Sequence, residues 1–238
     1  MPATHQGQRD LASTQIGNPA QKRKASPFDE SAEAYDLWFE SCEGKIIFEI
    51  EKNCLRGLLL VGKGPWLEVG VGSGRFASSL GVSEVLDPSS GMLAIAAGRD
   101  IRVVQGMGEE LPYRDATFYG VLMVTTFCFL TDPMRALSEC HRVLRPCGSL
   151  VVGIVPAESA WGRLYTAKGQ AGHPLYSHAN FYTCRGVIRI CAELGFVFEK
   201  ATSCLQTAPD EEPLLSLEEG INERAGFVAM RFLREQRI

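Results

Sequence analysis

The chain lacks the features by which membrane, secreted and nucleic-acid-binding proteins are usually identified. None of its apolar runs approaches the ~20 residues of a membrane-spanning helix, and residues 1–17 have no apolar core of a signal peptide. Positive charge is not in excess, because 24 lysines and arginines stand against 28 aspartates and glutamates, a net charge of −4. This balance excludes a general electrostatic affinity for nucleic acid or for an anionic membrane. We therefore expect a cytoplasmic protein with neither kind of partner.

Closely spaced cysteine pairs are also missing. None of the eight cysteines forms a CxxC pair, and most of them fall within apolar, periodic stretches. Zinc sites and dithiol redox sites generally use such pairs. We interpret the cysteines as small buried hydrophobic residues and expect no metal site.

The distribution of apolar residues predicts one folded domain behind a polar tail. Hydrophobic residues make up 45% of the chain, enough for a complete core. Residues 1–25 are polar and without periodicity, which predicts a disordered tail. The domain, residues 26–238, divides into N-terminal lid helices (26–62), a central core (63–155), an insertion (156–182), and a C-terminal helix with strands (183–238).

Two helices are expected before the core. Ser26-Pro27-Phe28-Asp29 is typical of a helix start, and a second helix is predicted over residues 43–60. Tyr35 lies on the aromatic stripe of the first helix. It either packs against the core or covers the functional site as part of a lid.

A strand followed by a glycine turn and a helix stands at the centre of the chain. Residues 66–69 form a short apolar run of the kind that fills a buried parallel strand. Glycines then alternate at positions 70, 72 and 74 before a short amphipathic stretch. Such a turn lets the backbone approach a ligand closely, with a helix N-terminus directed at it.

Strands and helices alternate through the rest of the core. Further strands are predicted over residues 83–86, 101–105, 119–124 and 149–155, followed by an antiparallel pair over 196–205 and 226–233. The alternation predicts an α/β fold with a Rossmann-like, doubly wound, mostly parallel seven-stranded sheet that has an antiparallel C-terminal strand.

An acidic residue, Asp87, follows the second strand, 17 residues after Gly70. At this place in a Rossmann-like sheet a carboxylate accepts hydrogen bonds from ribose hydroxyls. Asp87-Pro88 is also a good helix opening, so the carboxylate could instead only cap the next helix. The glycine turn upstream favours the ribose interpretation.

Four segments in order resemble the motifs of one enzyme family. LEVGVGSGRFA, VLDPSSGML, GEELPYRDATFYGVLM and DPMRALSECHRVLRPCGSLVV are similar to the successive motifs of class I S-adenosylmethionine (SAM) methyltransferases, in particular those of ubiquinone and menaquinone biosynthesis. The resemblance implies SAM as cofactor, a small-molecule methyl acceptor, and a monomeric or homodimeric enzyme.

The resemblance also implies which residues bind SAM. Glu68 would lie near its amino group, Asp87 would hold the ribose, and Met92 would lie over the adenine. Members of the family usually carry an acid where this chain has Met107, so adenine recognition would rest on backbone groups there. The implied cofactor-binding residues are Glu68, Gly70, Val71, Gly72, Gly74, Asp87, Pro88, Met92, Met107, Gly108, Glu109 and Thr125.

The insertion after the fifth strand is the candidate wall of the acceptor site. It carries His173 and His178, either of which could remove a proton from the acceptor near neutral pH. An aromatic face such as that of Tyr35 could hold the sulfonium charge. The alternative is a packed connector whose polar tips face water.

Two other functions fit parts of the pattern. A non-catalytic protein that binds SAM for regulation would keep the glycine turn and Asp87. An NAD-dependent oxidoreductase would use a similar turn, but Glu68 is a poor neighbour for a pyrophosphate.

Overall fold

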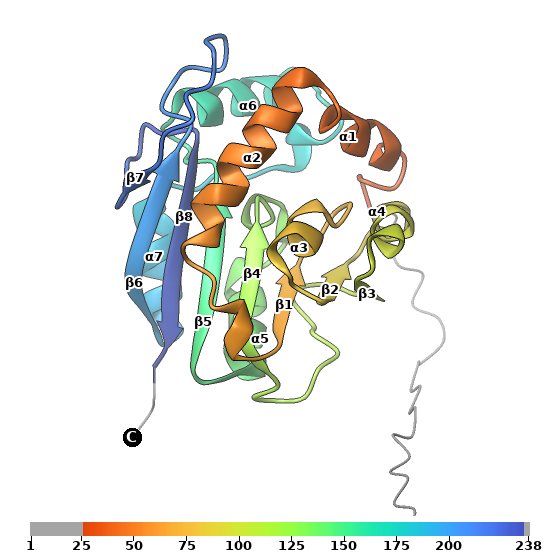
Figure 1. The fold of residues 1–238 in the computed structure, drawn as a ribbon, viewed down its shortest axis with the longest axis vertical. Coiled ribbons are helices and arrows are strands. Elements are labelled where there is room, and N and C mark those ends of the chain that lie inside the picture. The colour runs from red at the N-terminus through yellow and green to blue at the C-terminus, as the bar shows by residue number, and fades with distance from the viewer. Residues whose placement is uncertain (1–25, 236–238) are drawn as a thin grey trace, which may run out of the picture.

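The computed structural model describes residues 26–235, which form an eight-stranded sheet with helices on both faces (Figure 1). The strand order is β3-β2-β1-β4-β5-β8-β6-β7. The expected tail, residues 1–25, lies outside the described residues. Within residues 26–235, no helix is long and apolar enough to cross a membrane.

Five parallel strands form the larger part of the sheet. They are β1 (Trp66–Val69), β2 (Glu84–Asp87), β3 (Arg102–Gln105), β4 (Phe118–Val124) and β5 (Leu144–Ile154). The chain runs outward from β1 through β2 to β3 and then returns to place β4 on the other side of β1. Ligands of doubly wound sheets bind at the carboxyl ends of the strands where this reversal occurs.

Three antiparallel strands complete the sheet. β8 (Phe227–Arg234) pairs with β6 (Phe196–Cys204), as the sequence predicts, and also with β5. The eighth strand, β7 (Glu218–Glu219), is a two-residue edge strand on β6. The expectation of seven strands was one short, because two exposed glutamates carry no apolar pattern that would indicate a strand.

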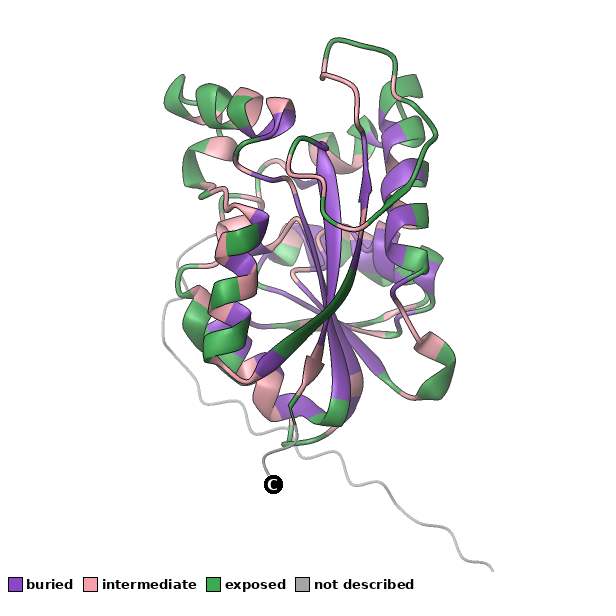
Figure 2. Cartoon of the chain, turned by 90° about the vertical axis from the view of Figure 1, so that its left-hand side faces the viewer, coloured by how far each residue is buried: buried purple, intermediate pink, exposed green. Residues whose placement is uncertain are grey.

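Helices bury both faces of the sheet. The helices after the first strand include α3 (Arg75–Leu80), α4 (Ser90–Ala96), α5 (Pro133–Val143) and α7 (Cys184–Glu193). The 3₁₀ turns are η1 (Val61–Lys63), η2 (Ala97–Arg99), η3 (Phe127–Phe129) and η4 (Tyr176–His178). One core includes α5 and α7, and the other includes the N-terminal helix α2 (Cys42–Arg56) with α3. Figure 2 shows the buried strands between these layers.

The N-terminal helix α1 (Ala32–Trp38) and the insertion helix α6 (Ala160–Gln170) lie beyond the carboxyl ends of the parallel strands (Figure 1). From the capping sequence we expected the first helix to begin at Ser26. It begins at Ala32. Ser26 and Asp29 instead close a turn, in which the Ser26 N–H donates to Asp29 at 2.9 Å. The other oxygen of Asp29 accepts from the Ser89 hydroxyl at 2.8 Å, a tertiary contact that places this turn against α4.

Candidate functional site

The three glycines after β1 all have positive φ, at 72°, 55° and 86°. A Cβ on Gly70 would lie 2.2 Å from Thr126 Cγ2, and one on Gly74 would lie 2.7 Å from Ile101 Cδ1. Gly72 differs, since the nearest atom to its hypothetical Cβ is a ring carbon of Tyr35 at 3.8 Å. The turn is therefore packed closely at its two ends and open at Gly72, below the Tyr35 ring.

Glu68 has a buried carboxyl group beside this turn, of which one oxygen accepts from the backbone N–H of Ala77 and the other is unpaired among the described residues. Its residue is only 1% exposed, and Oε2 is buried without a hydrogen-bond partner among the described residues. Burial, and secondarily the charge of Asp87, hold the pKa of Glu68 well above its usual range. A buried acceptor without a donor is costly, so the site is suited to a ligand that brings a donor, such as an ammonium group.

Asp87 joins the glycine turn to the start of α4. Its Oδ2 accepts from the Gly72 N–H at 2.8 Å, and its Oδ1 accepts from the Ser89 N–H at 2.8 Å. Burial raises the pKa of Asp87. The carboxylate does hold the start of α4, as the capping interpretation expects. Each oxygen also retains a lone pair that can accept from a ligand hydroxyl.

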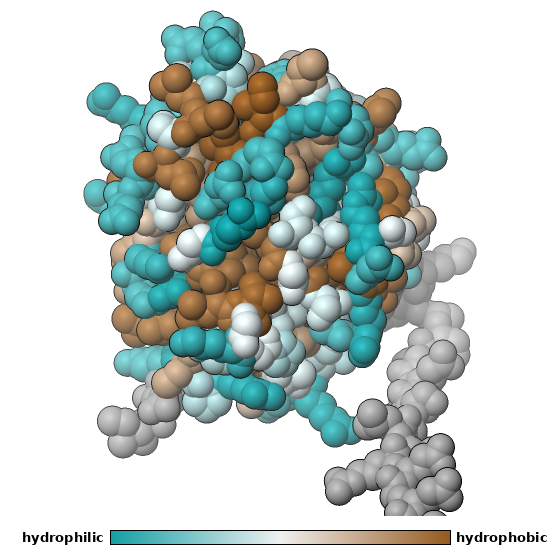
Figure 3. All heavy atoms as spheres, in the orientation of Figure 1, coloured by the Kyte–Doolittle hydropathy of each residue, from teal (hydrophilic) through white to brown (hydrophobic). Residues whose placement is uncertain are grey.

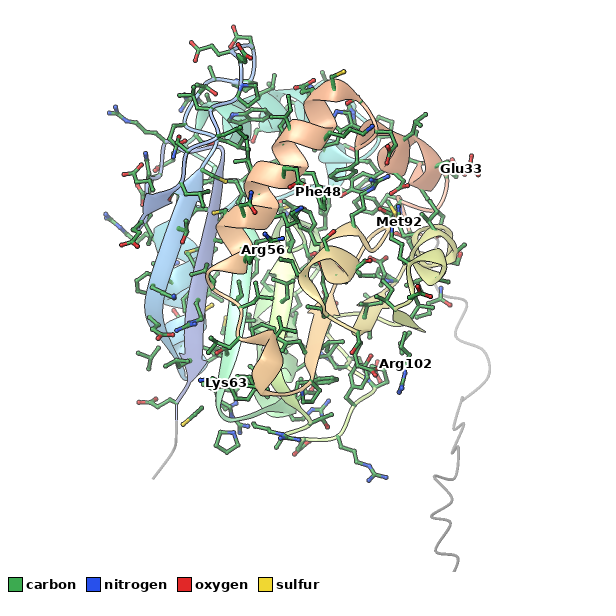
Figure 4. All side chains as sticks on the ribbon, viewed as in Figure 1. Glu33, Phe48, Arg56, Lys63, Met92 and Arg102 are labelled. Atoms are coloured by element: carbon green, nitrogen blue, oxygen red, sulfur yellow. The ribbon has the colours of Figure 1, made fainter. Side chains whose placement is uncertain are left out.

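The residues expected around adenine differ in how far they are buried. Met92 is 1% exposed and projects from α4, as labelled in Figure 4, whereas Met107 is 46% exposed. Gly108 is buried, and a Cβ there would lie 3.0 Å from a methyl group of Val69. Pro88 is exposed at the start of the turn before α4.

Glu109 uses its side chain within the protein. Its Oε1 accepts from the N–H groups of Thr131 at 2.9 Å and Asp132 at 3.2 Å, just before α5. Its carbonyl accepts from Arg135 Nε at 2.9 Å. These contacts give the Glu109 carboxylate a structural role in holding the loop before α5.

The end of β4 closes the other side of the turn. Thr125 has a positive φ of 51°, unusual for a β-branched residue. Thr126 Oγ1 donates to the Gly70 carbonyl at 3.0 Å. Backbone strain of this kind persists where the surroundings enforce it, often at functional sites. The resemblance implies Thr125 but not Thr126, whose contact with Gly70 joins residues far apart in the chain.

The described residues fit SAM chemically. Glu68 supplies an unpaired acceptor for an ammonium, Asp87 supplies acceptors for hydroxyls, and Gly72 leaves the backbone accessible. None of these three features favours a phosphate group, since two are carboxylates.

Comparison with known proteins identifies the family. Residues 67–152 match the family described as methyltransferase domain. A solved structure from Thermotoga maritima, described as a SAM-dependent methyltransferase and possible histamine N-methyltransferase, is 34% identical, with a TM-score of 0.81 over 88% of this chain and 99% of that one. The chain belongs to the SAM-dependent methyltransferase family.

Two curated relatives extend this result. A demethylmenaquinone methyltransferase of Thermotoga maritima is 31% identical over 146 residues, 58% of this chain and 63% of that protein. An uncharacterized protein of Methanocaldococcus jannaschii is 37% identical over 203 residues, 85% of this chain and 96% of that one. The protein is thus a SAM-dependent enzyme with the Rossmann-like fold that its motifs predict.

The methyltransferase ties its N-terminal helix to the glycine turn through ion pairs. Asp36 of α1 accepts from Arg75 Nε at 2.7 Å and from Arg99 Nη2 at 3.0 Å. Arg99 also donates to the Ser73 carbonyl at 2.8 Å. This arrangement fixes α1, and with it Tyr35, over the turn. No local pattern predicts these ion pairs, because they join residues up to 63 positions apart.

The two expected histidines lie in the insertion in different surroundings. His173 Nδ1 accepts from the N–H groups of Leu175 at 3.3 Å and Tyr176 at 3.4 Å, and its ring lies 4.5 Å from that of Tyr176. His178 is exposed on η4. His173 therefore uses one ring nitrogen to stabilise a turn of the methyltransferase.

Proposed function

We propose that this enzyme transfers the methyl group of SAM to a small-molecule acceptor and produces S-adenosylhomocysteine. The observation that carries the proposal is the buried, unpaired Oε2 of Glu68 beside the open glycine Gly72. When bound, SAM supplies a methyl group on a positively charged sulfur, which a nucleophile attacks in line.

The roles of the chain's own residues follow from their hydrogen-bonding capacity. Glu68 accepts from the amino group of the cofactor, and Asp87 accepts from its ribose hydroxyls while it holds Gly72 in place. The backbone of Gly70, Val71, Gly72 and Gly74 lies along the methionine part, and Pro88, Met92, Met107 and Gly108 surround the adenine. Thr125 borders the methyl group. Positioning of this kind can supply ~7–11 kcal/mol of the barrier to a two-reactant displacement.

A small acceptor is supported by the charge and by the relatives. The protein has no basic excess for a nucleic acid, and its 34%-identical solved relative is described as a possible histamine N-methyltransferase. We place the enzyme in the cytoplasm, as a monomer or homodimer, and its eight free cysteines support a reducing compartment. The N-terminal segment 26–62 acts as a lid on the core 63–155, and residues 156–182 form the acceptor wall.

The test is the fate of a labelled methyl group. Enzyme and methyl-labelled SAM are incubated with a cell extract divided into small molecules, protein and nucleic acid. We expect label to appear in the small-molecule fraction, in step with S-adenosylhomocysteine. Label confined to protein or nucleic acid contradicts the proposed acceptor class.

A further inference from the structure

One acidic residue of α2, Glu51, lies on the buried side of the helix. Figure 3 shows hydrophilic side chains on the outer surface of α2, and the exposed residues there include Lys45 and Glu49. The opposite side is apolar, with Ile47 and Cys54 buried. Glu51 belongs to this buried side and is only 9% exposed. A carboxyl group removed from water requires a partner or must stay neutral.

Glu51 has no such partner among residues 26–235. Its side chain makes no hydrogen bond or ion pair with any of them, and burial raises its pKa to about 8. The titratable groups whose pKa its charge raises are Tyr35 of α1, Tyr165 of α6, Tyr176 of η4 and Cys204 of β6. None of these groups is a cation. The cation at this cluster is Lys168, whose Nζ lies 5.8 Å from the centroid of the Tyr165 ring, and it makes no ion pair with Glu51. The Glu51 carboxylate therefore has acceptors and aromatic rings around it but no paired positive charge among the described residues.

The tyrosines around Glu51 form an ordered group. The rings of Tyr165 and Tyr176 stack with centroids 4.5 Å apart and planes 18° from parallel. The Tyr165 hydroxyl donates to that of Tyr176. The Tyr35 hydroxyl makes no hydrogen bond to any described residue. We call Tyr35, Glu51, Tyr165 and Tyr176 the tyrosine–glutamate cluster.

Tyr35 connects this cluster to the cofactor side of the site. Its ring is the nearest group to the open face of Gly72, at 3.8 Å. Burial raises the pKa of Tyr35, and the charge of Glu51, followed by those of Asp87 and Glu68, raises it further. Through Tyr35 the cluster therefore adjoins the open face of Gly72 in the glycine turn.

Building on the proposed methyl transfer, we propose that the tyrosine–glutamate cluster binds the ammonium group of a cationic amine, and that this amine is the methyl acceptor. The Glu51 carboxylate pairs with the ammonium, while tyrosine rings and hydroxyl oxygens surround it, since both attract cations. A cation is the one ligand charge that satisfies every unpartnered group of the cluster.

The same carboxylate balances the protons of the reaction. The bound ammonium gives one proton to Glu51, which leaves a neutral nitrogen with a lone pair. That lone pair forms the new C–N bond as the C–S bond breaks, and the electrons of the C–S bond neutralise the sulfur. The product leaves as a methylated ammonium, and Glu51 then releases its proton to water.

The first test compares amines with matched non-cations. Histamine, 2-phenylethylamine and putrescine are assayed beside 2-phenylethanol and phenylacetate, with S-adenosylhomocysteine formation as the readout. We expect turnover of at least one amine and of neither non-cation. In Glu51→Gln we expect kcat/KM for that amine to fall at least 100-fold with unchanged affinity for S-adenosylhomocysteine. Glu49→Gln, on the exposed side of the same helix, should match the wild type.

The second test uses pH. In calorimetric titrations of the complex with S-adenosylhomocysteine, the amine Kd should fall about tenfold per pH unit from pH 6 to 8, because Glu51 must lose its proton to pair with an amine that stays charged throughout. Tyr35→Phe should keep this pH dependence, and Glu51→Gln should lose it.

The outcomes separate the two proposals. Binding of S-adenosylhomocysteine without binding or turnover of any amine overturns the amine inference alone, as does full amine activity in Glu51→Gln. Failure of the wild type to bind S-adenosylhomocysteine overturns the proposed methyl transfer and this inference with it.

Discussion

Asp87 Oδ2 accepts a hydrogen bond from the Gly72 N–H at 2.8 Å, so the end of the second strand fixes the middle of the glycine turn. The residue that we propose to hold the ribose hydroxyls thus also holds the backbone that we propose to face the rest of the ligand. In the proposed site, one carboxylate therefore serves both to bind the ligand and to preorganise the turn. Substitutions at Glu68, Thr126 and Asp87 should therefore have different effects on SAM affinity and on the stability of the fold.

Substitution of Glu68 by glutamine should lower the affinity for SAM without lowering the stability of the protein. The amide keeps the shape but removes the charge that an ammonium needs, so we expect SAM affinity to fall about 10- to 100-fold. The melting temperature should stay level or rise, since a buried acidic group with one unpaired oxygen is replaced by a neutral amide. Calorimetry and thermal melts measure both, with Glu193→Gln on the surface of α7 as control. Unchanged SAM affinity would contradict the role of Glu68.

The Thr126 hydroxyl should stabilise the turn through the Gly70 carbonyl. Thr126→Val keeps the shape and removes the hydroxyl that donates to the Gly70 and Val124 carbonyls, which should cost about 1 kcal/mol of unfolding free energy and weaken SAM binding severalfold. The exposed Thr131→Val, changed in the same way, should do neither. Equal effects of the two substitutions in urea unfolding and SAM titration would show that the Gly70 contact is unimportant.

The ion pairs of Asp36 should make the free energy of unfolding depend on pH in the acidic range. Burial alone would raise the pKa of Asp36, but hydrogen bonds from Arg75, Ser73 and Arg99 lower it from 3.8 to about 2. A carboxyl whose pKa is lower in the folded state stabilises the protein above its unfolded pKa. That contribution, about 2 kcal/mol, is lost as pH falls from about 4 to about 2.

The matching variant is Asp36→Asn. It should lose this stability at neutral pH and show a flatter decline of unfolding free energy below pH 4. Limited proteolysis should cut α1 faster in the variant, because the helix is no longer tied to the glycine turn. A decline with pH as steep as that of the wild type would refute the assignment.

Cys147 is held in a conformation that favours glycine. It is exposed, with φ at 59°, within β5. Cys147→Gly should raise the unfolding free energy by about 1 kcal/mol, since a non-glycine residue in the left-handed region costs about that much. Cys147→Ala keeps the Cβ and should give no gain. Denaturant unfolding of the two variants decides the matter, and an equal gain in both would exclude backbone strain as the cause.

Local sequence patterns predicted the parts of the fold that depend on local order. The apolar run 66–69 is β1 as expected, and the antiparallel pairing of the last two long strands is confirmed. The glycine turn and the acid after β2 are adjacent in space because their strands are neighbours in the sheet. Such elements are recognisable because burial imposes a period on the residues themselves.

Long-range contacts account for what the sequence could not show. The Asp29 carboxylate contacts Ser89, 60 residues away, and displaces the expected start of the first helix. Glu51 looks like one of several charged residues on an amphipathic helix until its burial is known. The hydroxyl of Thr126 gives no local pattern at all. Partners of this kind are set by tertiary packing, which residue spacing does not encode.

Calorimetric titration with SAM and S-adenosylhomocysteine, for the wild type beside Asp87→Ala, tests the central claim most directly. We expect both ligands to bind the wild type, and Asp87→Ala to lose measurable binding while it still unfolds cooperatively. The exposed Asp210→Ala should bind as the wild type does. Binding of neither ligand by the wild type, or unchanged affinity in Asp87→Ala, would contradict the site described for this methyltransferase.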